Sequence, residues 1–181
     1  LAVVDEIIPP LKDSGFHGVV ISVTNPCDII ARLLYEKLGL PAGQIISSGT
    51  ALDSARLRKI LADQLGVDPR SVQGCVLGEH GESQVIPWSN VSIAGEPLFQ
   101  LMKRKPDKYG NLDLGYLSEK VRHGAKSIIA GKGYTQYGIG LVLTEIVQAI
   151  LHNERRVLPV SAFLPRQYGQ QCLFAAVPAV L

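Results

Sequence analysis

The spacing of apolar residues in the first fifty positions predicts a strand, a helix and a second strand. Residues 18–24 form a mostly apolar, β-branched run without strict alternation, which is typical of a strand buried on both faces of a parallel sheet. Between residues 28 and 38 the apolar positions recur at helical spacing, and Gly39 is placed to end the helix. A short strand at Ile45 and Ile46 would complete a βαβ unit.

An amphipathic helix is predicted before this unit, over residues 1–8, and Pro9 and Pro10 are expected to close it. Two parallel strands rarely form a stable sheet by themselves, so the pattern implies earlier strands that this sequence does not contain. The chain also begins at Leu1 rather than at methionine. We therefore expect a polypeptide that is shortened at its amino-terminal end.

The pattern after residue 48 predicts a body in which helices and antiparallel strands are mixed. Helices are expected at 52–65, 114–130 and 135–151, and strands at 72–77, 85–93, 157–163 and 172–176. The predicted fold class is therefore the α/β tail of a doubly wound parallel sheet followed by an α+β domain.

The composition is that of a globular chain without a strong electrostatic field. The 181 residues are 46% hydrophobic and 19% charged, and 18 basic against 16 acidic side chains give a formal net charge of +2. This balance gives no reason to expect nucleic acid or an anionic membrane as a partner. No apolar run reaches the length of about eighteen residues that a membrane helix needs.

The three cysteines, Cys27, Cys75 and Cys172, include no closely spaced pair. This spacing indicates neither a zinc site nor a disulfide framework. We therefore expect no metal ion, and we expect a reducing, cytoplasmic setting.

His80 lies in the run Gly78-Glu79-His80-Gly81, directly after an apolar stretch that is predicted to be a strand. The flanking glycines let the backbone approach a ligand closely, and the imidazole can leave the end of the strand. An imidazole with an ordinary pKa near ~6.5 exchanges a proton readily at neutral pH. A single loop histidine is more often only solvated, so this motif by itself leaves both interpretations open.

Asp53 and Arg56 lie three residues apart on the predicted helix over 52–65, so their side chains project in nearly the same direction. The carboxylate could fix the tautomer of a histidine, while the guanidinium could bind an anion. Two other interpretations remain open. Thr50 to Asp53 also fits a capping box, and Asp53 with Arg56 could be an ordinary surface ion pair.

Asn25 and Ser48 follow the two predicted parallel strands at their carboxyl ends, where open α/β sheets bind ligands. Either side chain could hydrogen-bond a cofactor amide or a substrate oxygen. Turn formation, by Asn25 before Pro26 and by Ser48 before a helix, would also explain both residues.

Four motifs follow one another along the chain. They are Thr24-Asn25-Pro26-Cys27-Asp28, Ser48-Gly49-Thr50-Ala51-Leu52-Asp53-Ser54-Ala55-Arg56-Leu57-Arg58, Leu77-Gly78-Glu79-His80-Gly81-Glu82-Ser83 and Gly131-Lys132-Gly133-Tyr134-Thr135. In this order they resemble the NAD-dependent L-lactate and malate dehydrogenase family. The resemblance covers nearly the whole chain and is strongest for the L-lactate and L-2-hydroxyisocaproate branch.

The resemblance implies hydride transfer between NAD(H) and a small L-2-hydroxy or 2-keto acid. His80 would be the acid–base residue, Asp53 its orienting partner and Arg56 the clamp for the substrate carboxylate. The substrate would also contact Asn25 and Thr135, and the cofactor would contact Val23, Asn25, Ser48 and Ile139.

The resemblance also implies a division of the chain. Residues 1–48 would be the end of a Rossmann-type dinucleotide-binding domain, and residues 49–181 a catalytic domain without its last helix. The Gly-rich loop and the lid with a catalytic arginine would precede Leu1, so the isolated chain is expected to be inactive. Members of the family are expected to be cytoplasmic homodimers or homotetramers.

Two alternatives to the L-lactate assignment stay open. One is malate dehydrogenase, although Thr135 favours monocarboxylic substrates. By the resemblance, Tyr137 stands where many lactate dehydrogenases carry tryptophan, and Glu82 replaces the commoner aspartate. Both departures leave room for a longer 2-keto acid. The other is a non-catalytic remnant that only folds and associates. A related phosphoglycosidase is disfavoured because metal-ligand cysteine and histidine positions are not apparent.

Arg58 matches a basic position that allosteric bacterial members use to bind fructose 1,6-bisphosphate between subunits. Gln73 stands where the histidine partner of that arginine would fall. The neutral partner predicts a weak effector site, and a plain solvated arginine would explain Arg58 equally well.

Overall fold

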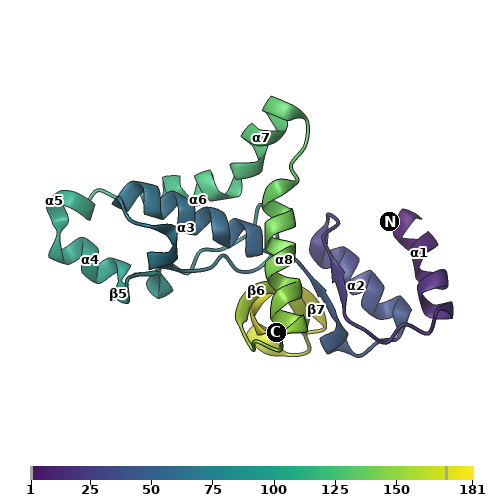
Figure 1. Cartoon of the computed structure of the whole chain (residues 1–181). Helices are drawn as coiled ribbons and strands as arrows, with labels where there is room; N and C mark the ends of the chain where they lie inside the picture. The colour runs from purple at the N-terminus through teal and green to yellow at the C-terminus, as the bar shows by residue number, and fades with distance from the viewer. Residues whose placement is uncertain (1, 170) are drawn as a thin grey trace.

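The computed structural model describes residues 2–169 and 171–181, which form two sheets surrounded by helices (Figure 1). The helices are α1 (Ala2–Asp13), α2 (Cys27–Leu38), α3 (Ala51–Leu65), α4 (Leu98–Arg104), α5 (Pro106–Tyr109), α6 (Leu114–Arg122), α7 (Gly124–Lys132) and α8 (Tyr137–Leu151). The strands are β1 (Val20–Ser22), β2 (Ile45–Ser47), β3 (Val72–Gln73), β4 (Ser92–Ile93), β5 (Glu96–Pro97), β6 (Val157–Leu164) and β7 (Leu173–Val180).

The larger sheet has the order β1-β2-β6-β7 and joins the beginning of the chain to its end. β1 and β2 are parallel and α2 connects them, so the predicted βαβ unit is present. β6 pairs antiparallel with β2 through Ser161 and Ser47, and β7 pairs antiparallel with β6 along its whole length. The sheet is therefore mixed, with a parallel half from residues 20–47 and a hairpin from residues 157–180.

Helix α2 covers the larger sheet because its apolar positions fall on one face. Ile30, Leu34 and Leu38 are buried, and they pack with Ile45 of β2 and Phe174 of β7. The helix ends at Gly39, whose φ of +72° is the left-handed conformation that glycine adopts without strain.

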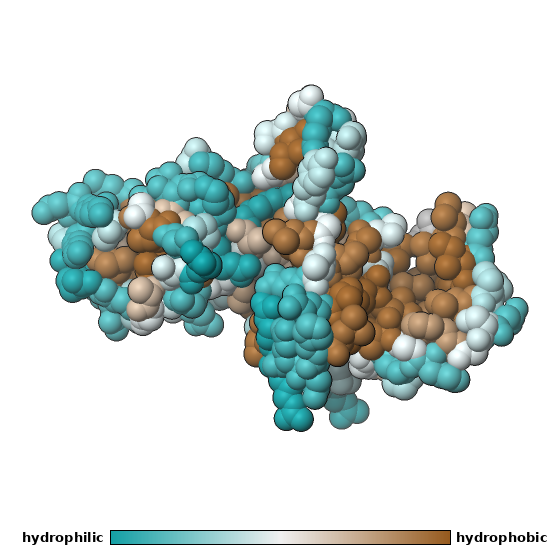
Figure 2. Space-filling model, in the orientation of Figure 1, coloured by the Kyte–Doolittle hydropathy of each residue, from teal (hydrophilic) through white to brown (hydrophobic). Residues whose placement is uncertain are grey.

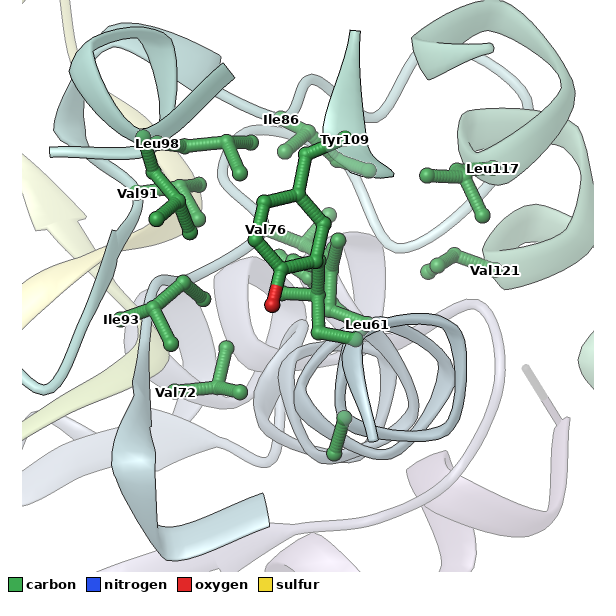
Figure 3. Packing of buried hydrophobic residues seen from close by; sticks show 14 residues of the cluster. Leu61, Val72, Val76, Ile86, Val91, Ile93, Leu98, Tyr109, Leu117 and Val121 are labelled. Carbon is green, nitrogen blue, oxygen red and sulfur yellow. The ribbon is translucent and has the colours of Figure 1, made fainter. Parts of the chain in front are cut away.

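Helix α3 carries the main core of the second half of the chain. Leu57, Leu61 and Leu65 recur every four residues, are almost fully buried, and pack against the small β3-β4-β5 sheet and α4 to α6 (Figure 3). The labelled side chains of that cluster point toward one another from several elements. Gly66 ends α3 in the left-handed conformation and donates its N–H to the carbonyl of Ala62. The core fixes α3 and therefore every polar side chain on its other face.

Helix α8 lies across the face of the molecule that Figure 1 shows. Figure 2 shows hydrophobic residues gathered beside this helix, on the side toward α2. An apolar cavity of about 290 Å³ lies in this region and is lined by Val19, Ile21, Val147, Ile150 and Leu151, among others. Within the described part of the chain, no helix combines the length and the apolarity that a membrane crossing requires.

The amino-terminal helix differs from its prediction. Pro9 and Pro10 lie inside α1, which continues to Asp13, although each proline removes a backbone donor. Burial explains the continuation, because Ile8 and Leu11 both pack on the core beneath α2. The tertiary contact outweighs the local signal for a helix end.

The region between residues 72 and 130 also departs from its prediction in four places. The strand expected at 72–77 is reduced to β3, and the strand expected at 85–93 is mostly irregular because Pro87 cannot donate to a ladder and a 3₁₀ turn follows it. α4 and α5 were not predicted, since their apolar runs are short and a proline separates them. The helix expected at 114–130 breaks at His123 into α6 and α7.

Candidate active site

The first turn of α3 presents a buried carboxylate. Asp53 has only 2% of its side chain exposed, and its Oδ1 accepts a hydrogen bond of 2.9 Å from Nη1 of Arg56. The positive end of the helix dipole stabilises an anion at this position. The pair is not a surface ion pair, and Thr50 makes no side-chain capping bond, so both alternative interpretations of these residues are wrong.

Thr50 and Ser54 instead tie α3 to the segment that leads to His80. Oγ1 of Thr50 donates to the carbonyl of Val76 at 2.5 Å, and the N–H of Val76 donates to Oγ of Ser54 at 2.9 Å. The hydroxyl of Ser54 donates a hydrogen bond to the carbonyl of Thr50 at 2.8 Å. Both backbone groups of the buried Val76 are thus bonded to the start of α3, which fixes the distance between that helix and the loop after Leu77.

This loop places His80 against Asp53. Nδ1 of His80 lies 2.6 Å from Oδ2 of Asp53, and the imidazole has 25% of its side chain exposed. A carboxylate oxygen accepts, so Nδ1 donates and Nε2 remains for proton exchange. The hydrogen bond to Asp53 raises the pKa of His80, while burial and the nearby Arg56 charge oppose the rise.

The edge strand β7 of the larger sheet anchors the same loop. The N–H of Gly78 donates to the carbonyl of Ala176 at 2.9 Å, and the N–H of Ala176 donates back to Gly78 at 2.8 Å. Gly78 has a φ of +89°, which only glycine adopts easily, so a side chain here would strain the bend before His80. Strand β7, although distant in sequence, therefore helps to set the site.

His80 and Arg56 open on a cavity of about 220 Å³. Of the residues that the sequence singled out, seven line it: Val23, Asn25, Ser48, Arg56, His80, Thr135 and Ile139. Asp53 lies behind the cavity, bonded to both His80 and Arg56. The structure thus brings the ends of β1 and β2, the start of α3, the His80 loop and the start of α8 around one space.

Five further residues line the cavity without having been singled out as ligand contacts: Cys27, Gly49, Leu52, Ala125 and Ile129. Cys27 donates through Sγ to Oδ1 of Asn25 at 3.1 Å, and burial raises the pKa of its thiol, so it is not a reactive thiolate. Leu52 could have been found from helical spacing, because it shares a face of α3 with Arg56. Ala125 and Ile129 lie one turn apart on α7, and no local pattern relates them to His80.

No metal centre accompanies these residues. Among residues 2–169 and 171–181, no cluster of histidine, cysteine, aspartate or glutamate has the arrangement that would hold an ion. Cys27, Cys75 and Cys172 are all free thiols. The polar side chains that line the cavity are one imidazole, one guanidinium, the amide of Asn25, the hydroxyls of Ser48 and Thr135 and the thiol of Cys27.

Comparison with known proteins identifies the family of the chain. Residues 50–181 match a protein family that is described as "lactate/malate dehydrogenase, alpha/beta C-terminal domain". The chain belongs to the lactate/malate dehydrogenase family. The family resemblance and the fold class predicted from the sequence are both confirmed.

The relatives in this family carry the name L-lactate dehydrogenase. L-lactate dehydrogenase 3 of Bacillus cereus is 41% identical over 179 residues, which are 99% of this chain and 57% of the relative. L-lactate dehydrogenase of Lactococcus lactis subsp. cremoris is 45% identical over 175 residues, 97% of this chain and 55% of the relative. The chain thus spans a little over half the length of these relatives.

Solved structures of the lactate/malate dehydrogenase family agree with the fold. The minor L-lactate dehydrogenase from Enterococcus mundtii in the ligands-bound form superposes with a TM-score of 0.94 at 42% identity, over 99% of this chain and 57% of that one. A lactate dehydrogenase from a Medee basin deep-sea metagenome gives a TM-score of 0.95 at 35% identity, with the same coverage.

A separate cavity of about 610 Å³ lies on another face of α3. Arg58 and Gln73 both line it, together with Arg70 and Arg156. The two residues that the sequence paired therefore border one space. The weak binding of fructose 1,6-bisphosphate at this place stays a prediction, because Gln73 supplies no positive charge.

Proposed function

We propose that this chain is the catalytic part of an NAD-dependent L-2-hydroxy acid dehydrogenase of the L-lactate branch. The observation that carries the proposal is the Asp53 carboxylate, which bonds His80 through one oxygen and Arg56 through the other beside a small cavity. In the proposed division, residues 1–48 are the end of a dinucleotide-binding domain and residues 49–181 the catalytic domain.

The side chains around the cavity divide the work of the reaction. Arg56 uses Nη1 for Asp53 and, with five N–H donors in all, retains a fork that can hold a carboxylate through two hydrogen bonds. This grip fixes a 2-keto acid so that its carbonyl oxygen faces Nε2 of His80. In the direction of reduction the imidazolium donates its proton to that oxygen, and in the direction of oxidation Nε2 removes the proton from the hydroxyl.

The residues present fit one end of NAD. Val23 and Ile139 offer an apolar wall and Ser48 a hydroxyl, which suit a flat ring that carries an amide. The cavity of about 220 Å³ is smaller than the roughly 300–1,000 Å³ of sites that enclose a drug-sized ligand, so it takes the nicotinamide end and a small acid rather than the whole dinucleotide. When bound, the nicotinamide carbon supplies or receives the hydride.

The charge of the cavity favours a monocarboxylic acid. Among the described residues that line it, Arg56 is the one lysine or arginine, so a second carboxylate would find no second lysine or arginine on these walls. The names of the relatives point to L-lactate as well. Malate dehydrogenase is therefore the weaker candidate.

We further propose a cytoplasmic homodimer or homotetramer. Three free thiols suit a reducing compartment. Leu141 and Tyr137 on α8 are about three-quarters exposed, and apolar residues presented on one helix in this way suit burial against a second subunit. Sedimentation analysis of the chain would measure the state directly, and a monomer at all concentrations would contradict this part.

The catalytic proposal is tested in a chimera in which this chain replaces its matching region of the Enterococcus mundtii enzyme. NADH oxidation is measured with pyruvate, 2-ketoisocaproate and oxaloacetate. We expect turnover with the first two, and His80→Asn should lower it by ~10²-fold or more while leaving NADH affinity nearly unchanged. His152→Asn, on a side chain far more exposed than His80, is the matched control.

An unchanged rate in His80→Asn would remove His80 from its role, and preference for oxaloacetate would assign the malate branch. The non-catalytic alternative is addressed on the 181-residue chain itself by titration calorimetry with NADH. Tight binding would contradict a remnant that only folds and associates.

A further inference from the structure

Asp28 joins three parts of the molecule at the edge of the proposed site. It is the second residue of α2, and its Oδ2 accepts the backbone N–H of His80 at 3.2 Å. Its Oδ1 accepts the hydroxyl of Ser161, in the middle of β6, at 2.5 Å. One carboxylate thus links α2, the His80 loop and β6, across sequence separations of 52 and 133 residues.

The burial of Asp28 imposes a desolvation cost on a charged carboxylate at this position. Asp28 is partly buried, and burial raises the pKa of its carboxyl while the two hydrogen bonds lower it. Within the described residues it forms no ion pair with a lysine or arginine. A leucine or alanine would avoid the desolvation cost. The two acceptor bonds are what a carboxylate provides here and an apolar side chain does not.

The His80 loop has two independent anchors, and they do different things. The paired backbone bonds between Gly78 and Ala176 fix where the loop leaves the sheet. Asp28 holds the backbone of His80 itself, two residues later, and so determines where the imidazole begins. His80 thus has one acceptor, Asp53, at its ring and a second acceptor, Asp28, at its backbone N–H.

We propose that Asp28 is a positioning residue for His80: it fixes the main chain so that the imidazole stays on Asp53 with Nε2 toward the cavity, and Ser161 in turn fixes Asp28. This inference rests on the proposed acid–base role of His80. Asp28 acts through His80 and contributes no group to the cavity wall. The charged groups that face His80 are Asp53 and Arg56 from α3 and Asp28 from α2, with Glu79 beside Asp28 in the loop.

The first test compares Asp28→Asn with Asp63→Asn in the chimera. The amide keeps the size of the side chain and loses one of two acceptors, whereas Asp63 pairs with Lys59 on the exposed face of α3. We expect Asp28→Asn to lower kcat by ~10-fold or more, because small misplacements of a reacting group are costly. KM for pyruvate and NADH affinity should change little, since Arg56 and the cofactor wall are untouched. Asp63→Asn should match the parent.

The second test measures the His80 imidazole by nitrogen-15 NMR in the 181-residue chain, without any activity. The carboxylate of Asp28 favours the imidazolium, so Asp28→Asn should lower the pKa of His80. The chemical shift of Nδ1 should also move toward that of an imidazole without a hydrogen bond to Asp53. Ser161→Ala leaves the Asp28 carboxylate in place and should give a smaller change in the same direction, in both kcat and the NMR titration.

The outcomes separate this inference from the function it rests on. If His80→Asn retains the parent rate, the proposed function fails whatever Asp28 does. If His80→Asn is inactive while Asp28→Asn keeps the parent kcat and the parent imidazole titration, the positioning role fails alone. Should Asp28→Asn not fold, as judged by circular dichroism, Ser161→Ala decides: an unchanged rate and an unchanged titration in that variant overturn the proposal.

Discussion

Helices α3 and α7 both contribute to the wall of the cavity, and they are packed in opposite ways. On α3, the site residue Asp53 lies among buried neighbours such as Ser54 and Leu57, and the helix is bonded to Val76 as well. α7 has no buried residue, and Ile128 and Ile129 are each more than 40% exposed. A helix with few buried contacts opens at low cost, whereas one inside a core does not.

This difference matches the demands of the proposed chemistry. Proton transfer requires His80, Asp53 and Arg56 to hold fixed distances, and these residues depend on α3. The α7 wall, formed by Ala125 and Ile129, has only to exclude water and to meet the side chain of the acid. We therefore expect stability and proton transfer to depend on α3, and substrate choice to depend on α7.

The largest effect on the free energy of unfolding is expected when a buried side chain of the α3 core is truncated. Leu61→Ala removes a fully buried side chain and should lower the free energy of unfolding by about 2–5 kcal/mol. Ile128→Ala on α7 should cost within about 0.5 kcal/mol, as surface changes usually do. Equilibrium denaturation of the two variants measures both values. Equal losses would show that the two helices are held alike.

Ser54→Ala tests the polar tie between α3 and the His80 segment. The variant leaves the buried N–H of Val76 without its acceptor, so the unfolding free energy should fall by about 1–3 kcal/mol. Ser127→Ala, at an exposed position of α7, is the matched control and should change it little. A Ser54→Ala chain as stable as the parent would mean that the tie does not hold the loop.

Ile129→Ala tests the adaptable wall by kinetics in the chimera. The smaller side chain enlarges the cavity on the α7 side, so kcat/KM for 2-ketoisocaproate should rise relative to pyruvate by about tenfold, the scale of a methylene or two in a pocket. Thermal stability should stay close to that of the parent. A loss of rate with both acids in equal measure would place Ile129 in the rigid part of the site instead.

The smallest effect is a pH trend in stability that only the α3 side should show. The pKa of His80 is raised in the folded chain, so its contribution is fully present below the unfolded value near ~6.5 and is lost as pH rises through the folded value. The stability difference between the parent and His80→Gln should therefore shrink as the pH rises from below ~6.5 through the raised folded value. Denaturation curves across that range measure it, and a difference that grows with pH would contradict the His80–Asp53 bond.

The sequence predicted the elements whose signals are local. The periodic leucines of α3 placed Asp53 and Arg56 on one face, and the glycines around His80 marked a bend, although the strand predicted before it ends at Gln73. The same kind of signal failed at Pro9 and Pro10, where packing on a distant core decides the outcome. A local sequence pattern reflects the residues that are adjacent along the chain, and it does not include the tertiary contacts that form when a segment is buried.

The parts of the site that could not be predicted depend on partners far apart in sequence. The bond between Ser161 and Asp28 spans 133 residues, and no pattern in either segment predicts that the two side chains meet. The pairing of Gly78 with Ala176 likewise requires knowing that the loop meets the free edge of β7. The approach of Ala125 and Ile129 to the cavity follows from the break at His123, which the helical pattern of residues 114–130 conceals.

The bond between Gly78 and Ala176 also has a consequence for biosynthesis. On the ribosome, His80 is made long before β7, which anchors its loop. At roughly 5–20 residues per second, about a hundred further residues take on the order of 5–20 s. During that interval the nascent chain can hold Asp53, Arg56 and His80 without their final arrangement. The order of synthesis thus delays the proposed chemistry until β7 has been made, so a ribosome stalled before β7 would carry a His80 loop without its anchor at Ala176.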